Sequence, residues 1–396
     1  MEYDFDAIIP RRGTDCEKWD LLAEDDVLPL WVADMDFRAA PAIVDALRRR
    51  VDEGVFGYAL PPSSWHESLI RWLARRHGWK IGPNSILDAT GVIPALAVTI
   101  RAFCKPGDKV VIQPPVYNCF YSVIHDQGCG IVENRLLRIP VPDGGEGDFT
   151  YEIDFEDLEH KAADAKLLIL SNPHNPAGRA WRADELRRVG EICFRHGVFV
   201  ASDEIHADLQ MPGSRHVPFA SLGGDFSHWS ATFWSASKAF NLAGLQTAAV
   251  VCANDAARER IRHVLRVNRT GELNPFGFAA SAAWDECEGW LDALRNHIHG
   301  NYCALMAFIR DRLPVLQIAR LEATYLAWVD ATPLGVPSAE LARRLEHEAK
   351  VKFSPGAIYG EEKGAAYLRI NLACPRTTLL EALGRTAGFI KELKRK

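Results

Sequence analysis

Three polar side chains of this chain, Lys238, Asp203 and Asn175, each come shortly after a short apolar run. A lysine in such a turn is a candidate nucleophile that forms a Schiff base with an aldehyde. A carboxylate can keep a ring nitrogen protonated, and an amide can donate to a phenolic oxygen. Together the three side chains suit pyridoxal phosphate, which needs all three partners. The apolar runs before them are Ala231–Trp234, Gly197–Ala201 and Lys166–Leu170.

Each of these signals has a plain alternative when it is taken alone. A lysine after Ser235-Ala236-Ser237 can be a solvated surface residue, and the Asn-Pro pair at Asn175 can be a simple turn. An acid at a strand end, such as Asp203, can be a helix cap. The joint arrangement decides, because ligands bind at the carboxyl ends of the strands in open parallel sheets.

A phosphate site is predicted from residues 88–92, which precede the helical pattern of residues 94–100. Backbone N–H groups at a helix start bind anions, so Thr90, Gly91 and Val92 are expected to hold the phosphate together with the Ser235 hydroxyl. Tyr117 follows another apolar run and is expected to stack on the pyridine ring. The alternatives are a plain strand-to-helix turn and a packed loop tyrosine.

The elements that position these residues alternate between apolar runs and helical patterns from about residue 85 to about 255. Continuous apolar strands separated by amphipathic helices predict an α/β fold with a mostly parallel sheet covered on both faces. From about residue 285, helical patterns enclose strands at 324–329 and 366–371, which predicts a smaller α+β domain. We expect an N-terminal segment (1–40) packed on the small domain, a large cofactor-binding domain (41–284) and a small domain (285–396).

Composition narrows the function further. The 396 residues carry a net charge of -6 with scattered basic residues, so we expect no nucleic-acid partner. We find no apolar stretch long enough for a membrane span and no targeting segment, which indicates a cytoplasmic protein. The 9 cysteines lack C-x-x-C spacing, and His297 and His299 cannot share a helix face, so we expect neither disulfides nor a metal.

Seven motifs, in order along nearly the whole chain, resemble those of fold-type I pyridoxal-phosphate enzymes, which have the aspartate aminotransferase-like fold. Within that superfamily they are most similar to the MalY/PatB group of cystathionine β-lyases and cysteine-S-conjugate β-lyases. The motifs are Pro29–Phe37, Phe56-Gly57-Tyr58, Ser171–Gly178, Ser202–His206, Ser235–Lys238, Thr324–Trp328 and Arg369–Pro375.

The resemblance implies a role for each residue of the site. Lys238 would bind the cofactor, Asp203 would pair with the pyridine nitrogen, and Arg369 would bind the substrate carboxylate. Tyr58 would reach the cofactor phosphate of a neighbouring subunit, so a homodimer with shared sites is expected. Further contacts are expected from Asn175 (phenolic oxygen), His206, Ser237 and Tyr117 to the cofactor, and from the Ala33 backbone and Tyr325 to the substrate.

One departure from the broader aminotransferase pattern favours a lyase. Many aminotransferases of this fold have an arginine eight residues after the lysine, where this chain has Gln246. The β-lyase group also tolerates the loss of that arginine. Removal of the substrate α-proton by Lys238 leads either to loss of a thiolate from the β-carbon or to transamination, and the shared motifs do not separate these outcomes.

The sequence therefore predicts a pyridoxal-phosphate-dependent carbon–sulfur β-lyase that converts L-cystathionine or another L-cysteine S-conjugate to pyruvate, ammonia and a thiol. The alternatives are an aminotransferase, a lyase acting on a specialised thioether in biosynthesis, and a regulatory protein that retains the cofactor. The complete constellation around Lys238 favours catalysis.

Overall fold

A seven-stranded sheet forms the centre of the computed structural model, which describes residues 3–141, 145–360, 365–393 and 395. Strand β10 runs antiparallel to both of its neighbours, and all other neighbouring strands are parallel. The predicted α/β fold with a mostly parallel sheet is confirmed. The strand order is β2 (Ile86–Ala89), β10 (Ala248–Val251), β9 (Ser230–Trp234), β8 (Phe199–Asp203), β7 (Leu167–Ser171), β3 (Lys109–Ile112) and β4 (Gly130–Glu133).

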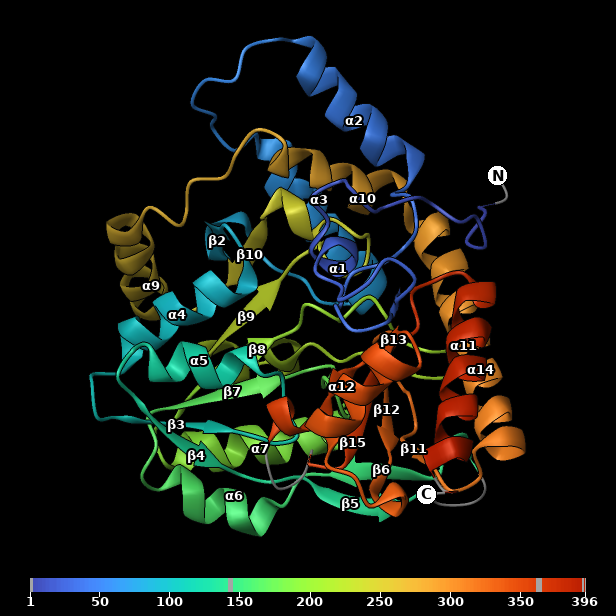
Figure 1. Ribbon diagram of the computed structural model, residues 1–396. Coiled ribbons are helices and arrows are strands. Elements are labelled where there is room, and N and C mark those ends of the chain that lie inside the picture. Colours follow the sequence, from blue (N-terminus) through green and yellow to red (C-terminus); the bar gives the residue numbers. More distant parts are fainter. Residues whose placement is uncertain (1–2, 142–144, 361–364, 394, 396) are drawn as a thin grey trace.

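The central strands β7, β8 and β9 are buried throughout because helices cover both faces of the sheet (Figure 1). Successive side chains of a strand point to opposite faces. In β7, Leu167 and Ile169 belong to one core and Leu168 and Leu170 to the other. The first core includes side chains of α4 (Val92–Phe103), α5 (Cys119–His125) and α9 (Asp255–Asn268), and the second those of α6 (Phe155–Ala162) and α7 (Ala183–Arg195).

A second, antiparallel sheet lies in the C-terminal part of the chain. Its strand order is β11 (Gln317–Ile318), β12 (Leu326–Asp330), β15 (Tyr367–Asn371) and β14 (Ser354–Pro355). The helices of this region are α11 (Glu288–Arg312), α12 (Ser338–Glu348) and α14 (Arg376–Leu393). A further antiparallel pair, β5 (Leu137–Pro140) with β6 (Phe149–Glu152), was not predicted, because the side chains of β5 are mostly exposed and give no apolar signal.

The N-terminal segment contains α1 (Glu17–Asp20) and β1 (Leu28–Pro29), which pairs in parallel with β13 (Val351–Lys352). It is followed by α2 (Pro41–Asp52) and α3 (Ser63–His77), and both of these helices contact α10 (Ser281–Glu286). A short helix α8 (Asp225–His228) precedes β9.

One apolar core joins Ile43 of α2 to Leu291 of α11 and Leu326 of β12, so it crosses the expected boundaries. The division at residues 40 and 284 therefore stays a prediction. Among the described residues, no helix has the length and apolar character needed to cross a membrane.

Candidate active site

The carboxyl ends of the parallel strands bring the predicted site residues together. Ser171, the last residue of β7, lies opposite Asp203, the last residue of β8, and Asp203 lies opposite Phe233 of β9. The loops that leave these three strands therefore start side by side. They carry Asn175 and Lys238, so the sheet register explains why residues far apart in the sequence face one site.

A single cavity at this edge is lined by ten of the predicted residues. Three others lie one hydrogen bond behind its wall: Arg369 donates to Asn175 Oδ1 (3.3 Å), the Tyr325 hydroxyl donates to the Ala33 carbonyl (2.8 Å), and Ser235 Oγ lies 2.6 Å from Ser237 Oγ. The lining residues are Ala33, Thr90, Gly91, Val92, Tyr117, Asn175, Asp203, His206, Ser237 and Lys238, joined by Ser171, Ile205 and Gln246 among others.

Lys238 is held by the backbone of the N-terminal segment. Its Nζ donates to the Ala33 carbonyl oxygen at 2.7 Å. Burial lowers the pKa of Lys238 to about 8, the charge of Arg369 acts in the same direction, and Asp34 and Asp203 oppose the change. A lysine with such a pKa has a far larger neutral fraction near physiological pH than an ordinary lysine, and both a nucleophile and a general base act in the neutral form.

Asp203 is a buried carboxyl at the cavity wall. Burial raises its pKa to about 7, although the Ile205 N–H donates to Oδ1 and the charge of Lys238 also favours the ionised form. A cation in the cavity would restore full ionisation, because an opposite charge at close range favours the charged form of a carboxyl. A protonated pyridine nitrogen is such a cation, so Asp203 suits the predicted role.

Some polar atoms near the cavity lack a hydrogen-bond partner among the described residues. His206 Nδ1 and Arg369 Nε are two of them, and both side chains are buried. Burial lowers the pKa of His206 to about 3, so its imidazole is neutral. Since buried polar groups are normally hydrogen-bonded, unpaired atoms at a cavity indicate a place for a polar ligand. The residues present therefore fit a bound pyridoxal phosphate and its amino-acid substrate.

The start of α4 forms another wall of the cavity, as predicted for a phosphate site. The Thr90 N–H already donates to the Thr270 carbonyl (3.0 Å). Thr90 can therefore contribute to a phosphate only through its hydroxyl, whereas Gly91 and Val92 stand at the helix start itself. Ser235 is also engaged, because its hydroxyl donates to the Thr247 carbonyl (2.6 Å).

Comparison with known proteins identifies the family. Residues 25–385 match the family described as aminotransferase class I and II. The chain belongs to this family. It is 43% identical to cystathionine β-lyase PatB of Bacillus subtilis over 96% of this chain and 98% of that protein. It is 32% identical to the protein MalY of Escherichia coli, with 99% of both chains covered.

A solved structure of the same family supports the fold in detail. Cystalysin from Treponema denticola, whose crystal structure contains a pyridoxal 5'-phosphate cofactor, superposes with a TM-score of 0.94 at 34% identity. The match covers 99% of this chain and 100% of that one. The predicted resemblance to the MalY/PatB group and the predicted fold are thus both confirmed.

Tyr58 does not line the cavity of its own chain. It is fully exposed, and Val55, Phe56 and Leu60 of the same connection are largely exposed. This connection, between α2 and α3, projects from the body of the molecule (Figure 1). Its role toward a second subunit stays a prediction.

The histidines that the sequence analysis set aside lie apart from the aminotransferase-family site. His297 Nε2 is 3.2 Å from the Cys374 carbonyl oxygen. His299 lies with Glu146 and Cys303 in a partly exposed group whose ligand atoms are within 4.8 Å of one another. Nothing else in the described residues points to an ion there, and the expectation of a metal-free enzyme stays a prediction.

Two residues that were not predicted from the sequence hold the N-terminal segment next to Lys238. Asn371 Nδ2 donates to the Val32 and Asp34 carbonyls (2.6 Å each), and Asn241 pairs with the backbone of Met35. Asn371 lies within the motif Arg369–Pro375, which was the signal available for it. Asn241 lies just after the motif Ser235–Lys238.

Proposed function

We propose that this protein is a pyridoxal-phosphate-dependent carbon–sulfur β-lyase. In this reaction L-cystathionine or another L-cysteine S-conjugate, with one water, yields pyruvate, ammonia and a thiol. The observation that carries the proposal is the buried Lys238 facing Asp203 across one cavity, in a chain 43% identical to cystathionine β-lyase PatB.

Within this proposal, the cofactor would be held by residues that line the cavity. Lys238 would bind its aldehyde carbon, Asp203 would pair with the ring nitrogen, and Asn175 would donate to the phenolic oxygen. Tyr117 would cover the ring. His206 and Ser237 complete the wall, and Thr90 stands beside the start of α4 for the phosphate. When bound, the cofactor withdraws electrons from the substrate α-carbon.

Lys238 would also move the proton that starts the reaction. When its Nζ is not bonded to the cofactor, Lys238 would accept the α-proton, and its pKa of about 8 suits that task. The Ala33 carbonyl, 2.7 Å from Nζ, is placed to orient the amine and to accept from its ammonium form.

Arg369 is the proposed partner of the substrate carboxylate. It is anchored by the Trp31 carbonyl (2.9 Å) and by Asn175, and it lies over the Tyr359 ring at 4.8 Å. Its free Nε, beside the cavity wall, offers a donor to an incoming anion. A guanidinium fork is the side chain best matched to a carboxylate.

We further propose a homodimer in the cytoplasm, with Tyr58 of each subunit reaching the other subunit's site. The exposed apolar side chains of Val55, Phe56 and Leu60 support an interface at the α2–α3 connection. The nine free cysteines suit a reducing compartment.

Pyruvate release from L-cystathionine by the cofactor-loaded protein, with no keto acid added, tests the lyase activity. We expect many turnovers per subunit, and none from Lys238→Ala. The rival is an aminotransferase, which the family description itself suggests. If no S-conjugate yields pyruvate while an added keto acid permits turnover of an ordinary amino acid, the protein is an aminotransferase and the proposal is wrong.

A further inference from the structure

Residues 31–37 form an irregular segment, here called the strap, that carries the acceptor for Lys238. The strap has no helix or strand of its own. Its Ala33 carbonyl accepts hydrogen bonds from Lys238 Nζ (2.7 Å) and from the Tyr325 hydroxyl (2.8 Å). An irregular backbone segment keeps one position only if other groups satisfy its polar atoms. The position of this carbonyl therefore depends on what fixes the strap.

Side chains from distant parts of the sequence bind the other strap carbonyls. Asn371 donates to two of them. Asn241 donates to the Met35 and Phe37 carbonyls (3.1 and 3.0 Å). The Trp31 carbonyl accepts from Arg369 and from Ser354 Oγ (2.8 Å). These bonds fix the strap to strands β14 and β15 of the small sheet and to the turn that follows Lys238.

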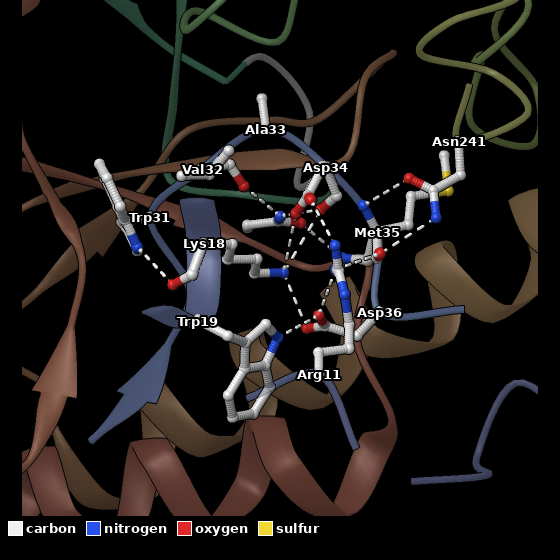
Figure 2. A network of polar contacts seen from close by, with 12 residues as sticks. Arg11, Lys18, Trp19, Trp31, Val32, Ala33, Asp34, Met35, Asp36 and Asn241 are labelled. Carbon is white, nitrogen blue, oxygen red and sulfur yellow. Dashed lines mark hydrogen bonds and ion pairs between the residues drawn. The ribbon is translucent and has the colours of Figure 1, made fainter. Parts of the chain in front are cut away.

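On its other side the strap is fixed by a group of charges, in which Lys18 and Asp36 are buried and Arg11 and Asp34 are partly exposed (Figure 2). Lys18 is 1% exposed, and its Nζ lies 2.7 Å from Asp36 Oδ2 and 3.6 Å from Asp34 Oδ1. Arg11 pairs with both carboxylates, at 2.9 Å to Asp34 and 3.0 Å to Asp36. Trp19 Nε1 donates to Asp36 Oδ1 (2.8 Å).

Burying this cluster of charges costs free energy, so its benefit must be something that apolar packing could not supply. Two cations balance two anions, but removing such groups from water is expensive, and similar apolar packing is often as stable. The benefit of a cluster in which every charge has an opposite partner is a single geometry. Asp34 and Asp36 both belong to the strap and closely follow Ala33 in the chain, so the geometry fixed is that of the Ala33 carbonyl.

We propose that Lys18, paired with Asp36, is a positioning residue for Lys238: it holds the strap so that the Ala33 carbonyl stays within hydrogen-bonding distance of the free Lys238 amine. The inference rests on the proposed function, in which that amine is the nucleophile and the base. It assigns a role to the segment before residue 20, whose described residues contribute no side chain to the cavity wall.

The ionisation of Lys238 reports the position of the strap. The hydrogen bond to the Ala33 carbonyl stabilises the ammonium form of Lys238 more than its neutral form. Loss of this bond therefore lowers the pKa of Lys238. The other charged or titratable groups that act on Lys238 or are acted on by it are Arg369, Asp34, Asp203, Cys119 and His206. A useful variant must leave all of these in place.

The variant that meets this condition is the double substitution Lys18→Met/Asp36→Asn, which removes one positive and one negative charge together. The amide oxygen introduced at position 36 can still accept from Trp19 and Arg11. We would measure capture of pyridoxal phosphate by the cofactor-stripped protein from pH 6 to 10, trap it with borohydride and weigh the intact chain. The midpoint is the pH at which half of the chains have captured the cofactor. We expect this midpoint to lie about one pH unit lower than in the wild type, which corresponds to the free energy of one hydrogen bond to a charged group.

Two controls make the result specific. Lys350→Met removes another ion pair of the N-terminal segment, with Glu24, that does not touch the strap, and the midpoint should not move. Trp19→Phe removes a single hydrogen bond and no charge, so it should fold even if the double variant does not. Its midpoint should move in the same direction by a few tenths of a pH unit.

An unchanged midpoint in a folded double variant, or in Trp19→Phe if the double variant does not fold, would overturn the positioning role. Lys238→Ala separates this from failure of the proposed function. If that variant still captures the cofactor with the wild-type midpoint, Lys238 is not the binding amine and the proposed function falls. If it captures none while the strap variants behave as wild type, only the inference about Lys18 is wrong.

Discussion

Asp203 and Glu204 are neighbouring buried carboxyls, and they differ in whether they line the cavity. Asp203 lines the cavity. Glu204 is buried away from it, where it accepts from Ser202 Oγ (2.9 Å) and from the Phe219 N–H (2.8 Å) and lies 2.7 Å from His216 Nε2. Burial raises the pKa of Asp203 to about 7 and that of Glu204 to about 8. Since only Asp203 lines the cavity, a cation bound there would lower the pKa of Asp203 and leave that of Glu204 raised.

These two pKa values predict how the stability of the cofactor-free protein depends on pH. A carboxyl whose pKa is higher in the folded state keeps its proton up to a higher pH there than in the unfolded state. The free energy of unfolding therefore falls as pH rises from the ordinary pKa of about 4 to the folded pKa of about 7 or 8. For Asp203 the loss is about 4 kcal/mol.

We therefore expect cofactor-free Asp203→Asn to be more stable than the wild type at pH 8 and to lose this advantage near pH 4, while it no longer supports turnover. Urea unfolding at several pH values measures the first effect. Glu204→Gln is the matched control, because it should flatten the same pH dependence and keep activity. If Asp203→Asn is as sensitive to pH as the wild type, the carboxyl is not protonated in the cofactor-free site.

At the scale of elements, helix α4 is the part of the site with the simplest electrostatics. It is twelve residues long and begins at Val92, on the cavity wall. Gln246 also lines the cavity and carries no charge. Without an arginine at this position, the partial positive charge of the helix start and nearby hydroxyls would carry more of the phosphate binding.

Thr90→Val should therefore weaken binding of pyridoxal phosphate about tenfold, the effect of one hydrogen bond to a charged acceptor. Its affinity for pyridoxal, which has no phosphate, should stay as in the wild type. Equilibrium titration of the stripped protein with both compounds gives the two ratios. An equal loss for both would show that Thr90 supports the fold and does not contact the phosphate.

The strands around the site could be predicted because their chemistry is local. β7 and β8 are mostly apolar and buried on both faces, and Asn175, Asp203 and Lys238 lie at or just after strand ends that must share an edge. The strap could not be predicted in the same way. It has no periodicity, and its geometry depends on Lys18, Asn241 and Asn371, whose contacts arise only in the folded chain.

At the scale of the whole molecule, the exposed α2–α3 connection is the feature that a single subunit does not explain. Tyr58 and its apolar neighbours face solvent, although apolar groups of this size are normally covered. Phe56 stacks on Phe276 at 5.8 Å, which gives the connection one anchor on its own chain. A second subunit is the proposed cover.

Mixing two inactive variants tests whether the sites are shared. If Tyr58 acts across the interface, Tyr58→Ala and Lys238→Ala homodimers lack activity for different reasons. After dissociation and reassociation in equal amounts, about half of the dimers are mixed, and each has one intact site. About a quarter of the wild-type activity should return. If mixing restores nothing in confirmed hybrid dimers, Tyr58 does not serve the partner's site.

The hydrogen bonds from Asn371 to the strap also determine how early in biosynthesis the site can form. The Val32 carbonyl, next to that of Ala33, is made long before the Asn371 amide that binds it, which comes 339 residues later. At roughly 5–20 residues per second, a ribosome needs roughly 20–70 s to cover that interval. Until then Phe37 and the other apolar residues near the strap lack much of their final packing. A newly made chain can therefore complete its cofactor site only late in translation, and chaperones have that long to protect it.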